Sequence, residues 1–462
     1  MKKIHIENII LVILIISSIF LTGSLWFDNY HGLSLVIAKL PIWLNETFDF
    51  NKIEYTEYIK PYKITITNGE SGNFSYYAFS EGNNKGFEVV KYIINHVPVN
   101  ASIETGFINE WNELQNRKSV ICELGNGIDI NMIKSIMPGN IYLSEIKNIS
   151  DIAVTKSVNG VIIYLKERNG KIYRILVDKN IPEFTNYIEE YSNKMTYTKL
   201  IKLEEMGTTV FFGNKEISKE SRVLFPVSTK QSNRRFVSEI EKQPFSETHD
   251  ADSMEKIINE VFLTYEYTKF TTTDNNYIFI KDDGSTIKIS NDGIIEYEAK
   301  ENAEHVENTI ISAFATALEC INDINSTENL YLLSAIENNE TYEFEFGINI
   351  ASLPVINTLD KVSSDSRVNI YIKVKNGKVI YYKGILDKYE EKTTNSYISS
   401  FGHNILDDVL KNIEKDTVVD IEKLELVYDV SNDKTLPSWF TTYKTDNNVE
   451  YILTQAAKKR RY

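Results

Sequence analysis

The stretch DIAVTKSVNGVIIYLKERNGKIYRILV, residues 151–177, decides the fold class. It consists of short runs rich in Val, Ile and Tyr, which are residues that favour strands. The runs are separated by Asn159-Gly160 and Asn169-Gly170. Asn-Gly tolerates the positive φ angles that a tight hairpin requires. We therefore expect this stretch to form successive antiparallel strands.

Similar hairpin signals recur along the chain and alternate with helical segments. Residues 276–299 turn at Asp283-Gly284 and Asp292-Gly293, and a later pair of strands turns at Asn376-Gly377. Apolar residues with helical spacing predict helices over residues 84–97, 302–323 and 396–413. The polar stretch 229–250 is predicted to be a loop. These patterns predict an α+β fold in which serial modules carry antiparallel sheets, each covered on one face by helices.

The chain of 462 residues is long enough for two to four domains. We expect seven segments: a cytoplasmic N-terminus (1–7), a transmembrane helix (8–27), a juxtamembrane segment (28–54), an N-terminal α+β domain (55–193), a central α+β domain (194–300), a C-terminal α+β domain (301–457) and a basic tail (458–462).

An uncharged and almost wholly apolar run extends from Asn8 to Phe27. A helix of about 20 residues spans the hydrocarbon core of a bilayer. Lys2 and Lys3 precede the run and Asp28 follows it, which predicts that the N-terminus is cytoplasmic and that the bulk of the chain is extracellular. We expect an uncleaved single-pass anchor; a cleaved signal peptide and a soluble core helix are the alternatives.

A second apolar segment, HGLSLVIAKLPIWLNETF, follows at residues 31–48. Lys39 and Pro41 interrupt it, so we do not expect it to span the membrane again. Two interpretations remain open. The segment either rests on the membrane surface or packs on protein, which is the ectodomain or a partner's juxtamembrane segment.

The composition is that of a folded domain, with 25% charged and 42% hydrophobic residues. The formal net charge of −15 argues against a nucleic-acid partner, because the phosphate backbone is itself negative. Cys122 and Cys320 are the two cysteines of the chain. We interpret them as isolated thiols, although a disulfide between them is the alternative.

No motif in the sequence predicts an enzyme. The chain has no H-E-x-x-H, G-x-S-x-G or P-loop motif, and we interpret the acids in His249–Asp252 as helix-start residues and not as metal ligands. S-x-x-K occurs at several places, among them 144–147, 253–256 and 431–434, without an accompanying K-T-G, which we attribute to chance in a chain rich in Ser and Lys. We therefore predict no catalytic residue, no cofactor and no metal site.

Several segments resemble one known family. They are LTGSLWF (21–27), YIKPYKITITNG (58–69), FINEWNELQNRKSVICELGNGIDINMIKSIM (107–137), DDGSTIKISNDGIIEYEA (282–299), FEFGINIASLPVI (344–356) and the closing LPSWF…YIL (436–453). In this order they resemble the YycH family of Gram-positive bacteria. The closing module also resembles the partner family YycI. The resemblance implies one transmembrane helix followed by an extracytoplasmic α+β region.

The resemblance also implies regulation rather than chemistry. YycH-like proteins associate with YycI-like single-pass proteins and with WalK, a sensor histidine kinase that controls cell-wall metabolism. The family's contacts are thought to run partly through transmembrane helices, and Ser18 and Thr22 share one face of the expected helix. Small and hydroxyl side chains allow helices to approach closely in lipid, so these two residues are the candidate partner-binding positions. A ligand-binding sensor ectodomain or, less favoured, a cell-wall enzyme are the alternatives.

Overall fold

The computed structural model divides the chain into two units, Met1–Glu54 and Tyr55–Tyr462. It describes residues 57–69, 73–98, 101–137, 145–193, 199–202, 216–217, 224–226, 236–243, 258, 267–271, 276–290, 293–300, 309–324, 329–357, 362, 365–398, 402–412, 418–431, 434–445 and 449–459. The expected anchor, including Ser18 and Thr22, lies outside the described residues. None of the helices in the described ranges has the length and apolar character needed to cross a bilayer.

The first sheet confirms the antiparallel strands predicted around residues 151–177. Its strands are β1 (Lys63–Asn68), β2 (Asn73–Tyr77), β3 (Ile103–Thr105), β4 (Lys118–Asp129), β5 (Asn148–Lys156), β6 (Val161–Lys166), β7 (Ile172–Val177), β8 (Lys199–Lys202) and β10 (Leu224–Pro226). They pair antiparallel in the order β10-β8-β2-β1-β4-β5-β6-β7-β3.

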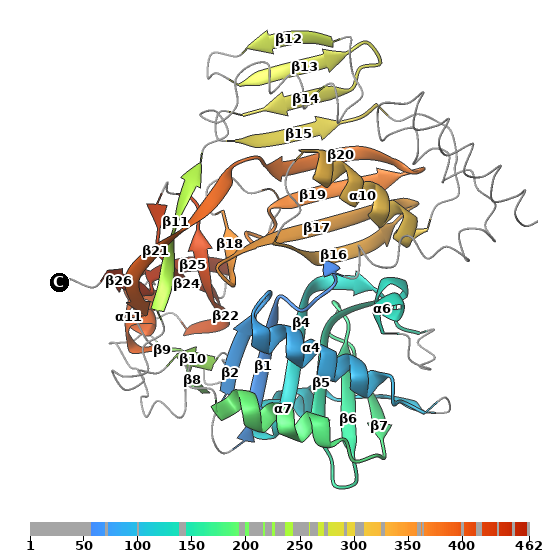
Figure 1. Cartoon of the computed structure of the whole chain (residues 1–462), viewed down its shortest axis with the longest axis vertical. Coiled ribbons are helices and arrows are strands. Elements are labelled where there is room, and N and C mark those ends of the chain that lie inside the picture. Colours follow the sequence, from blue (N-terminus) through green and yellow to red (C-terminus); the bar gives the residue numbers. More distant parts are fainter. Residues whose placement is uncertain are drawn as a thin grey trace, which may run out of the picture. The chain divides into compact units, whose positions relative to one another are not determined.

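Two helices, α4 (Glu81–Ile94) and α7 (Pro182–Asn193), lie along one face of this sheet (Figure 1). Alternate strand residues such as Ile64 and Cys122 are fully buried in the same core as Val90 of α4 and Ile188 of α7. Because successive side chains of a strand point to opposite faces, Lys63, Thr65 and Glu123 lie on the other face. That face carries the candidate site described below.

A second antiparallel sheet also has a helix packed on it. Its strands are β12 (Tyr267–Thr271), β13 (Tyr277–Lys281), β14 (Thr286–Ile289), β15 (Ile294–Glu298), β16 (Leu330–Asn338), β17 (Thr341–Ile350), β19 (Ile370–Lys375) and β20 (Lys378–Ile385), paired in the order β16-β17-β19-β20-β15-β14-β13-β12. Helix α10 (Ile310–Ile324) packs on β16, β17, β19 and β20 (Figure 1). Phe314 of this helix stacks on Phe346, with ring centroids 5.8 Å apart.

The remaining strands form the C-terminal part of the fold. β22 (Val418–Asp429), β24 (Ser438–Lys444) and β25 (Val449–Gln455) pair antiparallel in that order. Two short strands, β9 (Glu216–Ile217) and β18 (Leu353–Ile356), add to β22 in parallel. A separate sheet has the order β23-β11-β21-β26, formed by Lys434–Thr435, Phe236–Gln243, Lys388–Ile398 and Ala457–Lys459. Helix α11 (Gly402–Asn412) contacts β24 and β25.

The described residues therefore have an α+β fold with mostly antiparallel pairing, as predicted. The predicted turns are confirmed at Gly170, Gly284, Gly293 and Gly377, whose φ angles lie between +70° and +87°. The predicted loop over 229–250 is wrong, because residues 236–243 form β11 and pair with β21. Both cysteines are free thiols, as we interpreted them.

Strand β4 belongs to both sheets. Its first half pairs with β1 and β5, and beyond Glu123 its register on β5 shifts. There Gly127 and Ile128 pair in parallel with β16. Gly125 has a φ of +115°, and a Cβ built on it would overlap the backbone of Leu333 in β16. The absence of a side chain therefore lets the two sheets meet.

Replacement of Gly125 with Ala tests this junction. We expect Gly125→Ala to lower the free energy of unfolding by about 3 kcal/mol or more, because it adds backbone strain to a steric overlap. Gly170→Ala is the matched control, since Gly170 also has a positive φ but no atom lies within 4 Å of its added Cβ. The control should cost about 1–2 kcal/mol. Urea unfolding of the full-length protein in detergent checks both values, and equal losses would contradict this role of Gly125.

Candidate functional site

Four charged residues form a row across the face of the first sheet opposite α4 and α7. Lys63 of β1, Glu123 of β4, Asp151 of β5 and Lys166 of β6 are direct partners on successive strands. The outer lysines each pair with the neighbouring carboxylate, at 3.0 Å for Lys63–Glu123 and 3.2 Å for Lys166–Asp151. The order of charges is therefore positive, negative, negative, positive, with two carboxylates side by side in the middle. We call these four residues the charged row.

The two central carboxylates differ in their pKa. Burial alone would raise the pKa of Glu123, but the ammonium of Lys63 and the hydroxyl of Tyr62 lower it below its usual value. The pKa of Asp151 is raised, chiefly by burial, while Lys166 opposes the shift and the charge of Glu123 adds to it. Glu123 therefore holds its negative charge more readily than a free glutamate. The neighbouring Asp151 takes up a proton more readily than a free aspartate.

A buried guanidinium lies near the charged row. Arg367 is only 2% exposed, and its Nε and Nη2 donate to both carboxylate oxygens of Asp365 at 3.0 and 2.6 Å. Its Nη1 lies 3.6 Å from Oε1 of Glu425 in β22, which is equally buried. Burial alone would raise the pKa of Asp365, but the positive charge of Arg367 brings it well below the usual range. We call Arg367, Asp365 and Glu425 the arginine cluster.

Tyr62 connects the arginine cluster to the charged row. Its hydroxyl lies 2.8 Å from Oε2 of Glu123 and 3.1 Å from Oε1 of Glu425, so these two carboxylates compete for one proton donor. The Cζ of Arg367 lies 4.7 Å from the centre of the Tyr62 ring. A guanidinium at this distance is attracted to the negative face of the ring. Tyr62 therefore connects Glu123, 61 residues away, with Glu425, 363 residues away, through one side chain.

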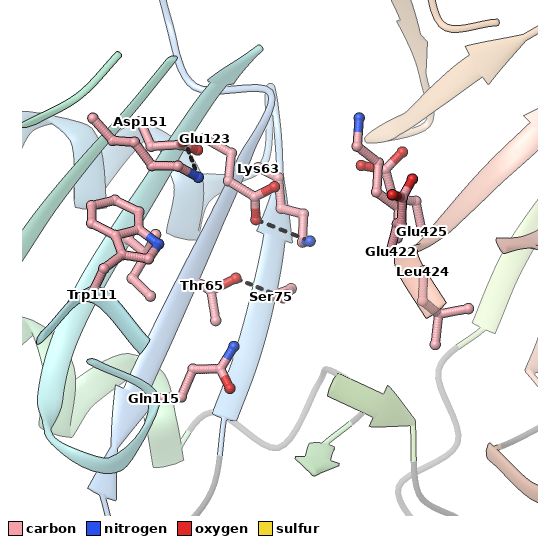
Figure 2. A pocket seen from close by; sticks show the side chains of 13 residues that line it. Lys63, Thr65, Ser75, Trp111, Gln115, Glu123, Asp151, Glu422, Leu424 and Glu425 are labelled. Carbon is pink, nitrogen blue, oxygen red and sulfur yellow. Dashed lines mark hydrogen bonds and ion pairs between the residues drawn. The ribbon is translucent and has the colours of Figure 1, made fainter. Parts of the chain in front are cut away.

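A cleft of about 250 Å³ opens between the charged row and β22. Figure 2 shows Lys63, Glu123 and Asp151 on one side of it, with Glu422 and Glu425 of β22 on the other. Trp111 of the short helix α5 (Ile108–Asn112) adds an aromatic wall. The register of β22 on β24 shifts between Ile421 and Lys423, which is a β-bulge.

The bulge leaves two successive residues, Glu422 and Lys423, exposed at the cleft. The pKa of Lys423 is lowered, first by the positive charge of Arg367 and then by partial burial. Below them, Oε2 of Glu425 is buried and accepts no hydrogen bond from the described residues. Nη1 of Arg367 likewise donates no hydrogen bond among them. The cleft is thus lined by charges that are not fully compensated.

This arrangement suits binding better than covalent chemistry. The cleft is lined by lysines, carboxylates and two hydroxyl residues, Thr65 and Ser75, and no histidine is among the lining residues. The hydroxyls of Thr65 and Ser75 lie 3.2 Å apart and pair with each other. Across the described ranges, no three His, Cys, Asp or Glu side chains are arranged to hold a metal ion. A fixed set of opposite charges in a cleft can recognise a charged ligand by complementary pairing.

The sequence-predicted positions lie wholly or partly outside the described residues. Ser18, Thr22 and the segment His249–Asp252 are not described, and the S-x-x-K stretches at 144–147, 253–256 and 431–434 each include residues that are not described. Sequence reasoning also missed the charged row. Polar side chains at alternate strand positions, such as Lys63 and Thr65, indicate a polar face of the strand. They do not give the register in which the strands pair, and only that register aligns the four charges.

Replacement of Arg367 with Met tests the arginine cluster. We expect Arg367→Met to lower the free energy of unfolding by about 3–5 kcal/mol, because it leaves buried carboxylates without their counter-charge. Arg174→Met is the matched control, since Arg174 forms partly exposed ion pairs with Glu104 and Glu110. That change should cost less than about 1 kcal/mol. Chemical unfolding of both variants measures the two losses in the free energy of unfolding. Similar losses would show that the arginine cluster stabilises the fold no more than a partly exposed ion pair does.

The arginine cluster also predicts a pH dependence. A carboxyl group whose pKa is depressed in the folded state stabilises the fold above the unfolded pKa, about 3.9 for Asp, and loses this effect as the pH falls below it. The stability difference between wild type and Arg367→Met should therefore be constant near neutral pH and shrink between about pH 5 and pH 2. Unfolding curves over this range test it. A difference that stays the same down to pH 2 would show that Asp365 is not held by Arg367.

Comparison with solved structures identifies similar folds. The crystal structure of YycH from Bacillus subtilis is similar with a TM-score of 0.50 and 13% sequence identity, covering 86% of this chain and 96% of that one. The YpeB C-terminal domain from Bacillus megaterium covers 46% of this chain at a TM-score of 0.25 and 10% identity, which is too low to indicate a shared fold. No protein-family model and no curated protein sequence matches the chain. The resemblance seen in the sequence is thus confirmed at the level of the fold, which is that of YycH.

Proposed function

We propose that this chain is a membrane-anchored, extracytoplasmic regulator that binds a WalK-type sensor histidine kinase together with a YycI-like single-pass protein. The similarity of its fold to YycH over 86% of the chain is the observation that carries this proposal. The apolar run from Asn8 to Phe27 supports an anchor, and the lysines before it support an outward-facing ectodomain. Cell-wall metabolism is the process that such a kinase would control.

A regulator of this kind acts without catalysis. A protein that binds a kinase changes its activity only when it has a different affinity for the kinase's two conformations. The proposed anchor packs beside the kinase helices within the bilayer, where Ser18 and Thr22 allow close approach. The ectodomain supplies further contact outside the membrane. In this proposal the chain is not an enzyme and needs no cofactor.

A sensor ectodomain that binds a small ligand is the second candidate function. One observation favours it, namely the charged cleft with the buried, unsatisfied oxygen of Glu425. The two functions are compatible, because a ligand that changed the ectodomain would alter what the kinase contacts. They are distinguished by separate measurements, since kinase binding and ligand binding have different readouts.

Replacement of Ser18 and Thr22 with Leu tests the intramembrane contact. We expect this double variant to weaken co-purification of the kinase about three- to tenfold, because contacts between membrane helices contribute about 0.6–1.5 kcal/mol. Exchange of the whole anchor for an unrelated transmembrane helix should weaken it more. Ile16→Leu with Phe20→Leu is the matched control, since these positions share the opposite face of a helix.

The same experiment needs a check of topology. Protease added to intact cells without their wall should digest the bulk of the chain in every variant, because the ectodomain faces outward. If the chain is protected from the protease, the anchor orientation is wrong. If the anchor exchange leaves co-purification unchanged while the topology is correct, the contact with the kinase is made by the ectodomain alone.

A further inference from the structure

The cleft between the charged row and β22 has the features of a ligand site, and we propose that it binds a small α-amino acid or the amino end of a short peptide. This proposal deepens the second candidate function, ligand binding by the ectodomain, and rests on it, but it does not rest on the binding of a kinase. The charges that line the cleft, one buried oxygen and the apolar wall support it.

The balance of charge in the cleft favours a ligand that carries an ammonium group. Three lysines and four carboxylates line it, an excess of one negative charge: Lys63, Lys166, Lys423, Glu123, Asp151, Glu422 and Glu425. Lys63 and Lys166 are already paired within the charged row. The carboxylates of β22 are therefore the groups that remain to meet a positive ligand.

Glu425 provides a specific hydrogen-bond acceptor for an ammonium group. Its side chain is 2% exposed, and its Oε1 receives the Tyr62 hydroxyl and lies near Arg367. Its Oε2 accepts no hydrogen bond from the described residues, although a buried charged oxygen normally has a donor. Leaving such an oxygen unsatisfied destabilises the fold, because the buried group has lost its hydrogen bonds to water. An ammonium group has three donors and would satisfy it, with Glu422 at the rim as a second anion.

The other end of the ligand would meet Lys423. This lysine is exposed on the bulge of β22, next to Glu422, and no hydrogen bond or ion pair is described for its ammonium. A carboxylate in the cleft would pair with it. The positive charge of Arg367 lowers the pKa of Lys423, so an anion beside Lys423 would relieve that repulsion. A zwitterion would therefore pair with Lys423 at one end and with Oε2 of Glu425 at the other.

The walls of the cleft limit the size and kind of the ligand. A volume of about 250 Å³ admits a ligand of one or two amino-acid residues and not a long chain. Trp111, Ile121 and Leu424 provide an apolar surface for a short aliphatic side chain. A neutral sugar would leave the excess negative charge uncompensated, so it fits less well.

Calorimetric titration of the full-length protein in detergent tests the proposal with four probes. The probes are the dipeptide Ala-Ala, its N-acetyl form, its C-terminal amide and N-acetylglucosamine. We expect Ala-Ala to bind, the N-acetyl form to bind at least tenfold more weakly and the amide to bind severalfold more weakly. Lys423→Met should weaken Ala-Ala to the level of the amide and leave the amide unaffected. Lys373→Met, a lysine of β19 outside the cleft, should change neither.

Variants of the two carboxylates of β22 test the contact with the ammonium group. Glu425→Gln should weaken Ala-Ala at least tenfold, and Glu422→Gln, at an exposed position, should weaken it severalfold even if Glu425→Gln is unstable. Thermal unfolding of each variant separates loss of fold from loss of binding. Equal affinity for Ala-Ala and its N-acetyl form, tighter binding of N-acetylglucosamine or no binding of Ala-Ala would each overturn the proposal. None of these outcomes bears on whether the chain binds a kinase.

Discussion

The buried Arg367 guanidinium is the group on which the surrounding structure depends. It is held by Asp365, lies against the ring of Tyr62 and faces Glu425 across the cluster. A buried charge is tolerated only when it is paired and hydrogen-bonded, so these segments must meet at one place for the fold to be stable. The cluster therefore joins the residue before β1 to β22, 363 residues later in the sequence.

The same constraint shapes the cleft. Charges that stabilise the contact between β1 and β22 also line the space beside it, and the bulge in β22 turns Glu422 and Lys423 toward that space. Strand β4 carries Glu123 and, beyond it, Gly125, so one strand holds both the charged row and the junction of the two sheets. The Tyr62 hydroxyl lies within hydrogen-bond distance of both Glu123 of β4 and Glu425 of β22, so it links β22 to the strand that carries the junction.

The sequence predicted what depends on local chemistry. Asn169-Gly170 and Asn376-Gly377 mark hairpins because glycine adopts positive φ, and the apolar spacing of residues 302–323 marks a helix, although its first turns lie outside the described residues. Strand β11 was missed because its sequence FVSEIEKQ is largely polar, and only its pairing with β21 makes it a strand. The site was missed for a related reason. Arg367 and Tyr62 are about 300 residues apart, and no sequence pattern links them, so only the folded chain shows that they meet.

We propose that the chain regulates a sensor kinase by binding it. The most direct test is the autophosphorylation rate of a WalK-type kinase in reconstituted membranes, measured with and without this chain and its YycI-like partner. We expect a rate that changes with the amount of the chain and reaches a plateau. A rate that stays the same at every amount, with the chain folded and correctly inserted, would contradict it.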